Sequence, residues 1–596
     1  MCRISGIVHL ASTPTIAEST AMRDSMQHGG PDDAGLYIDE INHIALGHRR
    51  LSLIDLTSAG HQPMKSFNSE CIVVFNGEIY NYQEIKNELL SLGYHFISNS
   101  DTEVILSAYH QWGTNCFSKF NGMFALAIYD KVQAKLILAR DHAGIKPLYF
   151  NIDDNSLYFA SEVRAFKTIN HNWPENNDWR IYFLLFGYIP EPITTLNNVF
   201  SIEKGSYLEV NLKNLKFNKY KFIQYNYNYT IFSENEAISQ IKLSVEQAVK
   251  RHLISDAPIG LFLSGGIDSS ILTLLAKKYC GNNLTTLSID FEESKFSENK
   301  YQQLIIDISN AKHHTYKVSK QQFNEAIPDI LNAIDQPSND GINSYFITKY
   351  AKEAGLKAVL SGIGADELFG GYPSFKRHKI LNYTKCIPDY LINAAVLFPN
   401  DKLKRVQFLA NKTFPGNYYF NRGFFTPADI AKYLDISLSE VNKVMNTISL
   451  PQFILSQHPL EQVSYEESNW YMLNQLLKDT DYMSMWHAVE VRVPFLDKEL
   501  IDLVYSIHPD IRYNSKQIKH ILIKAFKDIL PEAIWNRPKQ GFAFPFQQWF
   551  ADVNLSLTKN VKSDNLKAGL VSGKTHWSRY WCYNLSQHKI NNTSAW

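Results

Sequence analysis

The chain has 596 residues, of which 45% are hydrophobic and 20% charged, so it can form several domains and is typical of globular rather than disordered proteins. Its 59 basic residues balance its 59 acidic ones, and no basic stripe indicates nucleic acid or a membrane surface as a partner. The six cysteines lie far apart with no CxxC pair, which argues against a zinc site or a disulfide framework and favours a reducing compartment.

The amino-terminal segment MCRISGIVHL has a cysteine directly after the initiator methionine. Its apolar stretch is too short and polar for a signal peptide, and no run elsewhere approaches the ~20 apolar residues of a membrane span, so we expect a cytoplasmic protein. If Met1 is removed, Cys2 holds both a thiol nucleophile and a free α-amine that can act as its base. Taken alone, the dipeptide favours a simpler interpretation, a small residue that allows methionine removal.

Residues 1–210 show short strands with turns between them. One runs from 70 into Asn76–Gly77, others cover 123–130 and 205–210, and 134–150 is expected to be a strand, a turn and a second strand. A helix is expected over 81–94, where apolar residues recur at helical spacing. This pattern predicts an α+β unit rich in antiparallel pairing. Asn76 and Gly77 are expected in a turn, where a side-chain amide and a backbone N–H could form an oxyanion hole. Asp101 is expected to cap a helix.

The polar residues 211–233 are predicted to be a linker, and the pattern then changes. Helix 234–255 has one apolar face. Strand, glycine turn and helix follow one another over 257–279, and strands alternate with helices up to a second glycine turn near 361–372. This alternation predicts a parallel sheet with helices on both faces. From about Pro388 onward the chain is expected to be mainly helical.

The segment LFLSGGIDSS ends a buried strand in a turn without side-chain bulk and then starts a helix. Backbone N–H groups and the helix N-terminus can together hold an anion, although this is not a Walker loop. Asp268 would repel phosphates unless a metal lies between them, and Mg²⁺ is the usual solution. Asp366 follows a second strand end and would face the same crevice, although it could equally be a solvated acid at a helix start.

Lys539 lies in a loop bounded by proline and glycine and is a point charge suited to phosphates, although a lone loop lysine is usually just solvated. SGGxDS resembles the pyrophosphate loop of ATP pyrophosphatases. Cys2, NGE, SDTE and SGGxDS, in this order, resemble the glutamine-dependent asparagine synthetases from Cys2 to about Trp549.

The resemblance implies a two-domain protein of mixed α/β and α+β class. A class II glutamine amidotransferase domain (1–210) with the αββα fold of N-terminal-nucleophile hydrolases is followed by a linker (211–233). An ATP-pyrophosphatase-type synthetase domain (234–596), a Rossmann-like parallel sheet with helical additions, completes the chain. Glutamine and ATP would be substrates, Mg²⁺ a cofactor, ammonia would pass through an internal channel, and a homodimer is possible.

The same resemblance assigns roles to residues. Cys2 would attack glutamine, and Asn76 and Gly77 would hold the oxyanion. The glutamine-binding set is Arg50, Leu51, Ser52, Asn76, Gly77, Glu78 and Asp101. The ATP-binding set is Leu263, Ser264, Gly265, Gly266, Asp268, Ser269, Ile289, Ser361 and Gly362. Asp268 and Asp366 would hold Mg²⁺, and Lys539 would neutralise charge during adenylation.

Three residues depart from the family pattern. Arg3 replaces a glycine beside the nucleophile, where it could lower the thiol pKa or crowd glutamine. Gly29 replaces the arginine of the family's HRGPDD segment. Ile363 replaces a glutamate of the SGEG turn and can neither shuttle a proton nor bind a charged group.

Aspartate is the default acceptor, which would give asparagine, glutamate, AMP and pyrophosphate. The alternative is the same chemistry on another carboxylate, such as a sugar uronic acid of a surface polysaccharide or a peptide or secondary-metabolite precursor. A catalytically inactive scaffold is a third hypothesis, against which the intact Cys2, Asn76, Asp268 and Asp366 argue. A β-lactam-forming relative is a fourth, but such relatives typically lack the N-terminal cysteine.

Overall fold

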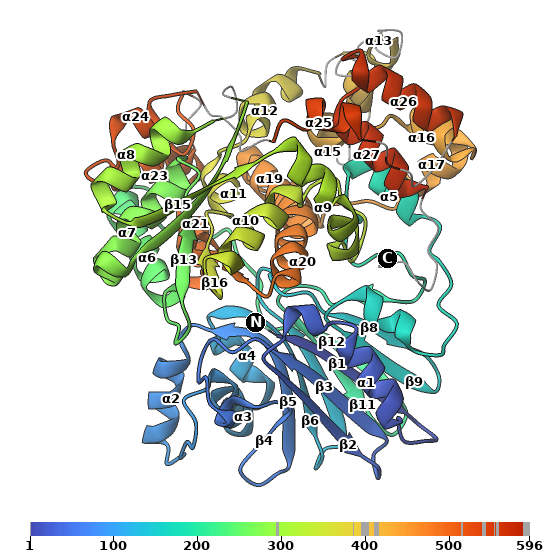
Figure 1. The fold of residues 1–596 in the computed structure, drawn as a ribbon, viewed down its shortest axis with the longest axis vertical. Coiled ribbons are helices and arrows are strands. Elements are labelled where there is room, and N and C mark those ends of the chain that lie inside the picture. The colour runs from blue at the N-terminus through green and yellow to red at the C-terminus, as the bar shows by residue number, and fades with distance from the viewer. Residues whose placement is uncertain are drawn as a thin grey trace.

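The structure is a computed structural model, and it describes residues 2–293, 297–384, 387–394, 405–410, 416–513, 516–538, 544–553, 555 and 560–587. Figure 1 shows two domains stacked along the long axis, the lower one in blue to teal and the upper one mostly in green to red. The teal helix α5 (Trp179–Phe186) lies in the upper domain, where it packs against α16 (Pro427–Leu434), α17 (Leu438–Met445) and α27 (Trp577–Ser586). The expected mixed class is confirmed, because the N-terminal sheets are antiparallel and the C-terminal sheet is parallel.

The N-terminal domain is built on two six-stranded sheets. The first has the order β10 (Phe200–Ser201), β8 (Tyr149–Ile152), β9 (Ser156–Ala160), β1 (Arg3–His9), β3 (Ile44–Arg50) and β2 (Asp33–Asp39). The second has the order β12 (Phe217–Lys221), β11 (Ser206–Asn211), β7 (Lys135–Arg140), β6 (Gly122–Asp130), β5 (Cys71–Ile79) and β4 (Met64–Lys65).

The two sheets pack face to face through one apolar core, to which Ile4 and Leu46 contribute from one sheet and Val74 and Leu138 from the other. Helix α1 (Ile16–Asp24) covers the outer face of the first sheet, and α2 (Tyr82–Ser91) and α3 (Asp101–Trp112) cover that of the second. The layers are therefore helix, sheet, sheet, helix, because both sheets are apolar on both faces.

The C-terminal domain contains a five-stranded parallel sheet. Its order is β15 (Lys312–Val318), β14 (Thr285–Phe291), β13 (Ile259–Phe262), β16 (Ala358–Leu360) and β17 (Glu490–Arg492). One face packs on α6 (Glu234–His252), α7 (Ile267–Cys280), α8 (Asn299–Ser309), α21 (Lys498–Ser506) and α23 (His520–Phe526). The other face packs on α10 (Ile342–Glu353), with α9 (Lys320–Ala333) and α20 (Lys478–Trp486) nearby.

The described residues after β16 are mainly helical, and from about Pro388 onward this is the expected structure. They form α11 (Ala365–Phe369), α12 (Pro373–Thr384), α13 (Asp389–Asn393), α15 (Gly416–Arg422), α16 (Pro427–Leu434), α17 (Leu438–Met445), α18 (Gln452–Leu455), α19 (Pro459–Glu466), the π-helical η9 (Glu467–Leu477), α22 (Pro509–Arg512), α24 (Glu532–Trp535), α25 (Phe546–Asp552), α26 (Val561–Val571) and α27 (Trp577–Ser586). No helix in the described part of the chain is long and apolar enough to cross a bilayer.

Two local predictions differ from the structure. Residues 217–221, expected in the linker, form β12, an edge strand that pairs with β11; its five side chains are exposed, which explains its polar sequence. Asn76 and Gly77 do not form a turn. They lie inside β5, where Gly77 pairs with Phe124 of β6, and the strand continues to Ile79.

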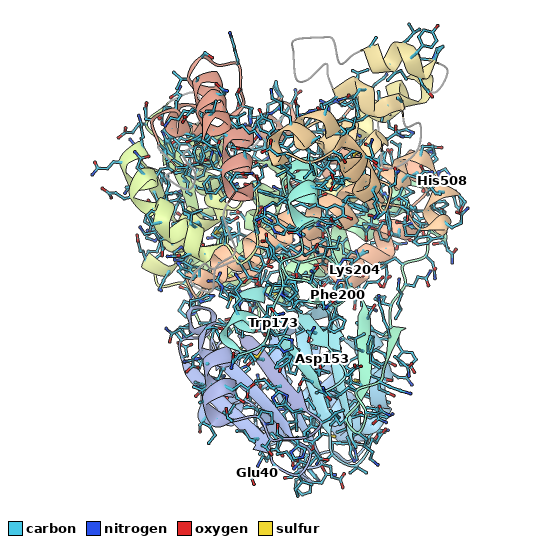
Figure 2. All side chains as sticks on the ribbon, turned by 90° about the vertical axis from the view of Figure 1, so that its right-hand side faces the viewer. Glu40, Asp153, Trp173, Phe200, Lys204 and His508 are labelled. Atoms are coloured by element: carbon cyan, nitrogen blue, oxygen red, sulfur yellow. The ribbon has the colours of Figure 1, made fainter. Side chains whose placement is uncertain are left out.

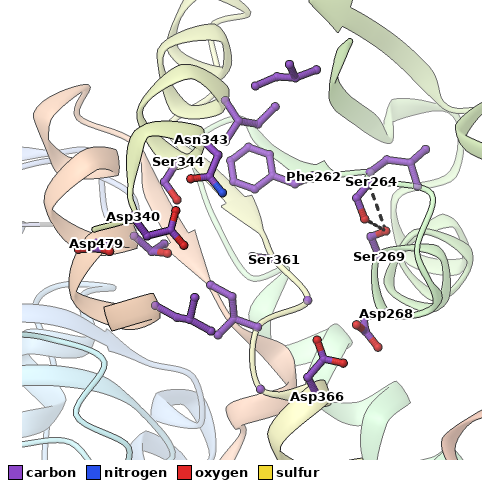
Figure 3. Close-up of a pocket in the computed structure, with 18 of the residues that line it drawn as sticks. Phe262, Ser264, Asp268, Ser269, Asp340, Asn343, Ser344, Ser361, Asp366 and Asp479 are labelled. Carbon is purple, nitrogen blue, oxygen red and sulfur yellow. Dashed lines mark hydrogen bonds between the residues drawn. The ribbon is translucent and has the colours of Figure 1, made fainter. Parts of the chain in front are cut away.

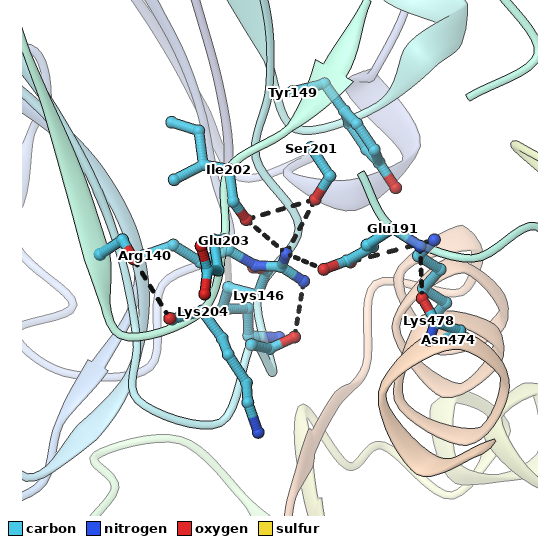
Figure 4. Close-up of polar contacts among 12 residues, drawn as sticks. Arg140, Lys146, Tyr149, Glu191, Ser201, Ile202, Glu203, Lys204, Asn474 and Lys478 are labelled. Atoms are coloured by element: carbon cyan, nitrogen blue, oxygen red, sulfur yellow. Dashed lines mark hydrogen bonds and ion pairs between the residues drawn. The ribbon is translucent and has the colours of Figure 1, made fainter. Parts of the chain in front are cut away.

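Buried polar contacts join the two domains. The Arg140 guanidinium donates to Glu191 Oε2 at 2.8 Å, and the Glu191 backbone N–H donates to Asn474 Oδ1 of η9 at 2.7 Å (Figure 4). Lys478 Nζ donates to the Ile189 carbonyl at 3.2 Å. Figure 2 shows Lys204 at the level where the domains meet. These contacts fix the orientation of η9 and α20 relative to the N-terminal sheets.

Candidate active sites

Cys2 directly precedes β1 and lines a small pocket, with 7% of its surface exposed. Its backbone nitrogen donates to Asn76 Oδ1 at 3.2 Å. Burial raises the pKa of the Cys2 thiol, whereas the nearby amino terminus, a backbone hydrogen bond from Leu51 and Arg50 lower it. The thiol therefore needs a base beside it to become a nucleophile, and an α-amine on Cys2 itself would be in position.

The two polar atoms of the Asn76 side-chain amide differ in their hydrogen bonding. Its Oδ1 accepts from Cys2, whereas its buried Nδ2 has no hydrogen-bond partner among the described residues. Gly77 follows with φ +153°, and a Cβ on it would lie 2.0 Å from the Met123 carbonyl oxygen. The strand pairing of β5 with β6 thus requires glycine here and leaves one amide donor beside Cys2 available for an oxyanion.

Two buried carboxyl groups, Glu78 and Asp101, line the same pocket. Asp101 is the first residue of α3 and accepts from the Ile79 backbone N–H at 3.0 Å, while the N-cap is Ser100, so the expectation of an Asp101 cap is wrong. Burial raises the pKa of Asp101 to about 6. Burial and Glu490 raise that of Glu78, which lies 3.4 Å from Arg492 of β17.

Of the other residues expected to bind glutamine, Arg50 and Leu51 line this pocket and Ser52 does not. The Arg50 guanidinium is held by backbone carbonyls, donating to Thr57 at 2.9 Å and Asp55 at 2.5 Å. The Ser52 backbone N–H donates to Asp32 Oδ2 at 2.8 Å. The structure therefore brings together Cys2 and every residue of the expected glutamine-binding set except Ser52. Asn76 does not line the pocket itself but is hydrogen-bonded to Cys2.

Arg3 neither lines the pocket nor is among the main causes of the raised Cys2 pKa. Its buried guanidinium donates to Glu162 at 2.7 Å and to Asp481 of α20 at 2.8 Å, so it joins the two domains. A Cβ on Gly29 would lie 2.8 Å from Arg3 Cγ. The two departures from the family pattern are therefore neighbours in space, and Gly29 leaves room for the Arg3 side chain.

A second cavity of about 340 Å³ lies at the carboxyl ends of β13, β14 and β16 (Figure 3). The expected nucleotide residues that line it are Leu263, Ser264, Asp268, Ser269, Ile289, Ser361 and Gly362, together with Asp366. Gly265 and Gly266 lie in the loop but do not line the cavity. Ser264 Oγ and Ser269 Oγ are 3.0 Å apart, and the first turn of α7 has no side-chain cap, so its N–H groups remain available for an anion.

Asp268 and Asp366 meet at a residue that the sequence did not single out, Lys519. Lys519 Nζ lies 2.5 Å from both Asp268 Oδ2 and Asp366 Oδ1, and its pKa is raised by these carboxylates. A Cβ on Gly362 would lie 2.8 Å from Asp268 Cβ, so glycine allows the two strand-end loops to approach each other. A lysine alone in a polar segment gives no sequence signal for this contact.

Lys539 lies outside the described residues. Arg537, two positions earlier, donates to the Gly265 carbonyl at 2.9 Å and to Glu298 at 3.1 Å. The segment that leads to Lys539 therefore reaches the glycine loop at the cavity.

At the other end of the cavity lie Asp340, Asn343 and Asp479, which the sequence analysis missed. The signal was present in LLKDTDYMSMW, where charged residues interrupt an apolar helical run. Ile363 also lines the cavity, so no carboxylate occupies this position in the turn.

Comparison with known proteins agrees with both halves of this geometry. The sequence model of the glutamine amidotransferase domain matches residues 1–221, and that of asparagine synthase matches residues 240–586. The chain belongs to the asparagine synthase family. It is thus an ATP-dependent, glutamine-dependent amidotransferase of asparagine synthetase type.

Relatives extend over most of the chain. Asparagine synthetase (glutamine-hydrolyzing) 1 of Bacillus subtilis strain 168 is 31% identical over 578 residues, which cover 94% of this chain and 90% of that protein. A putative asparagine synthetase of Mycobacterium tuberculosis strain H37Rv is 30% identical, covering 88% and 83%. Amidase chry2 of Gibberella zeae is 26% identical, covering 90% and 86%. Chains similar to this one therefore include a protein named as an amidase as well as proteins named as asparagine synthetases.

Proposed function

We propose that the chain releases ammonia from glutamine at Cys2 and uses it to convert a carboxylate into an amide at the second cavity. The single observation that carries the proposal is that one chain has both pockets, the Cys2–Asn76 pocket and the glycine-loop cavity at the sheet edge. The products would be the amide, glutamate, AMP and pyrophosphate.

The proposal requires that Met1 has been removed from the mature protein. In the first pocket, the free α-amine of Cys2 then takes the proton of the Cys2 thiol. The sulfur attacks the side-chain carbonyl carbon of glutamine, and Asn76 Nδ2 and the Gly77 N–H donate to the oxygen that becomes negative. The carbon–nitrogen bond then breaks while the α-amine of Cys2 gives the proton to the leaving nitrogen, so that ammonia is released. A thioester on Cys2 remains, and water hydrolyses it to glutamate. Glu78 and Asp101 would hold the glutamine ammonium, and Arg50 its carboxylate.

In the second cavity, the acceptor carboxylate attacks the α-phosphorus of ATP and pyrophosphate leaves. Ammonia then attacks the acyl carbon, one proton is lost, and AMP leaves. Ser264 to Ser269 would hold the pyrophosphate, Leu263 and Ile289 would flank the nucleotide, and Lys539 would offset charge. Leu51 and Ser52 remain proposals as glutamine contacts, as do Ser361 and Gly362 as nucleotide contacts.

Mg²⁺ is a proposed cofactor. The described residues contain no group of three or more His, Cys, Asp or Glu side chains suited to a metal ion, so the ion would depend on the two aspartates and on phosphate oxygens. Asp268 and Asp366 fit this, since they are oxygen ligands that converge on one point, now occupied by Lys519 Nζ. Bound Mg²⁺ would neutralise charge on the phosphates.

Glu78 of the glutaminase pocket contacts Arg492 of β17, and β17 pairs with β16, whose end leads to Ser361. This continuity supports transfer of ammonia between the domains. Dissolved ammonia is mostly ammonium at neutral pH, which is not a nucleophile, so a path through the protein would keep it reactive.

Aspartate is the default acceptor, and a sugar uronic acid or a peptide or secondary-metabolite precursor is the alternative. Two observations favour the alternative. Ile363 offers no charged contact, and none of the described residues lining the cavity is basic.

The test uses wild-type protein, Cys2→Ala and, as a matched control, Cys71→Ala, a buried cysteine outside both pockets. We expect Cys2→Ala to lose glutamate formation and to keep ammonium-dependent release of AMP and pyrophosphate, and Cys71→Ala to keep both. Release of ADP and phosphate, or glutaminase activity in Cys2→Ala, would contradict the proposal.

A further inference from the structure

The glycine-loop cavity has two chemically different ends. Ser264, Asp268 and Asp366 mark the end that is proposed to hold the phosphates, and Asp340 and Asp479 lie at the other end (Figure 3). Asp340 precedes α10 and Asp479 lies on α20, so this second end is built between two helices of the same sheet face. It is where an acceptor would project beyond its reacting carboxylate.

The lining of the cavity is acidic. Its five carboxyl groups are those of Asp268, Asp340, Asp366, Glu367 and Asp479, and no lysine, arginine or histidine lines it among the residues that the structure describes. The Lys519 ammonium contacts the two carboxylates of the phosphate end, those of Asp268 and Asp366. Lys478 donates to the Ile189 carbonyl, and its charge lowers the pKa of the neighbouring Asp479 only in part, since that pKa stays well above its usual value.

Asp340 and Asp479 form the core of the far end. Ser338 Oγ donates to Asp479 Oδ2 at 2.6 Å and accepts from the Asp340 backbone N–H at 3.2 Å, so one serine holds both residues. Burial raises the pKa of both carboxyls, and Asp340 raises that of Asp479 further. Two like charges that line one cavity away from bulk water are unfavourable unless a proton, a cation or hydrogen-bond donors reach them.

Asn343 supplies a third hydrogen-bond acceptor at this end of the cavity. Asn343 Oδ1 is a buried oxygen that has no hydrogen-bond partner among the described residues, and Asn343 lines the cavity beside Asp340. Buried polar atoms of this kind are normally satisfied, so the missing donors would come from a bound molecule. Three hydrogen-bond acceptors therefore lie together at this end.

A second carboxylate on the acceptor would be repelled here. The α-carboxylate of aspartate would enter a site with two aspartates and no described basic residue, and the apolar Ile363 gives it no partner. Hydroxyl or ammonium groups would instead donate to Asp340, Asn343 and Asp479.

We propose that Asp340, Asn343 and Asp479 select an acceptor with one carboxylate whose remaining polar groups are hydrogen-bond donors, either hydroxyls or an ammonium. This inference rests on the proposed function and gives the substrate class of the same site.

The experiment measures pyrophosphate release from MgATP with ammonium chloride as nitrogen donor, which bypasses Cys2. D-glucuronate supplies hydroxyls, β-alanine supplies an ammonium, and L-aspartate and succinate supply a second carboxylate. We expect kcat/KM for glucuronate or β-alanine to exceed that for aspartate and succinate at least about tenfold, a factor that corresponds to 1.4 kcal/mol. Whichever of glucuronate and β-alanine has the higher kcat/KM shows whether the site recognises hydroxyls or an ammonium.

The variant D340N/D479N keeps side-chain size and removes both charges, so we expect the preference against aspartate to fall at least about fivefold. Asp528→Asn, at an exposed ion pair with Lys242, should leave the preference unchanged. Aspartate as the best acceptor of the wild type, or an unchanged preference in a folded D340N/D479N, would overturn the inference and leave the proposed function intact. No pyrophosphate with any of the four acceptors would count against both.

Discussion

Replacing Arg3 with alanine removes the arginine that joins the Cys2 strand to α20. The side chain is fully buried, and it contacts Glu162 at 2.7 Å and Asp481 at 2.8 Å. Breaking a buried ion pair by removing one partner typically costs about 3–5 kcal/mol of folding free energy. Glu162 keeps Arg164 at 2.7 Å and Asp481 keeps Lys146 at 2.8 Å, so we expect the lower end, about 3 kcal/mol.

Gly29 allows the reasoning to be checked by a double-mutant cycle. In Gly29→Ala the new Cβ would lie 2.8 Å from Arg3 Cγ, and overpacking of this kind costs about 1–3 kcal/mol. In the Arg3→Ala background that contact is absent, so Gly29→Ala should become nearly neutral. The expected coupling free energy is therefore about 1–3 kcal/mol.

The assay is denaturant unfolding of the wild type, both single variants and the double variant, followed by tryptophan fluorescence. Trp486, at the end of α20, packs against His28 with ring centroids 4.7 Å apart, so fluorescence reports on this interface. An equal cost for Gly29→Ala in both backgrounds would refute the proximity argument. A cost below about 1 kcal/mol for Arg3→Ala would show that the two ion pairs contribute little.

Three further predictions concern the two pockets. Asn76→Ala should lower glutaminase kcat by about 10²–10³-fold because it removes an oxyanion donor. Ammonium-dependent pyrophosphate release is the control and should stay unchanged. An undiminished glutaminase rate would exclude the oxyanion role of Asn76. The pKa of Asp101 is raised to about 6 by burial, so below that pH the carboxyl is protonated and loses its charge for the glutamine ammonium. The value of kcat/KM for glutamine should then fall about tenfold per unit below pH 6, and a flat profile down to pH 5 would contradict the assignment. Lys519→Met should lower pyrophosphate release by about 10²-fold or more, since the buried lysine no longer holds Asp268 and Asp366 in place beside the phosphates, while glutaminase activity in the Cys2 pocket persists. A synthetase rate within about twofold of wild type would rule out a role for this lysine.

Much of the architecture could be predicted from the sequence because local patterns decide it. The apolar face of 234–255 and the strand–glycine–helix order over 257–279 predicted elements that the structure has at Glu234–His252, Ile259–Phe262 and Ile267–Cys280. Ser264, Asp268, Ser361 and Asp366 could be expected at one crevice, because the carboxyl ends of parallel strands meet at one sheet edge.

Other features depend on contacts between distant segments and have no local signal. Asn76–Gly77 looks like a turn, but pairing with β6 along the whole of β5 keeps it in a strand. Arg3 and Gly29 became neighbours only through the fold, as did Lys519 and the two aspartates. The acidic far end of the cavity depends on Asp340 and Asp479, which lie 139 positions apart in the sequence.

The most direct test of the account is the intact mass of purified, active protein before and after labelling with 6-diazo-5-oxo-L-norleucine, a reactive glutamine analogue. The account predicts a chain without Met1 that takes up one label, on Cys2, and loses glutaminase activity in proportion. Protein that retains Met1 and still hydrolyses glutamine, or that is inactivated by label on another residue, would contradict the account.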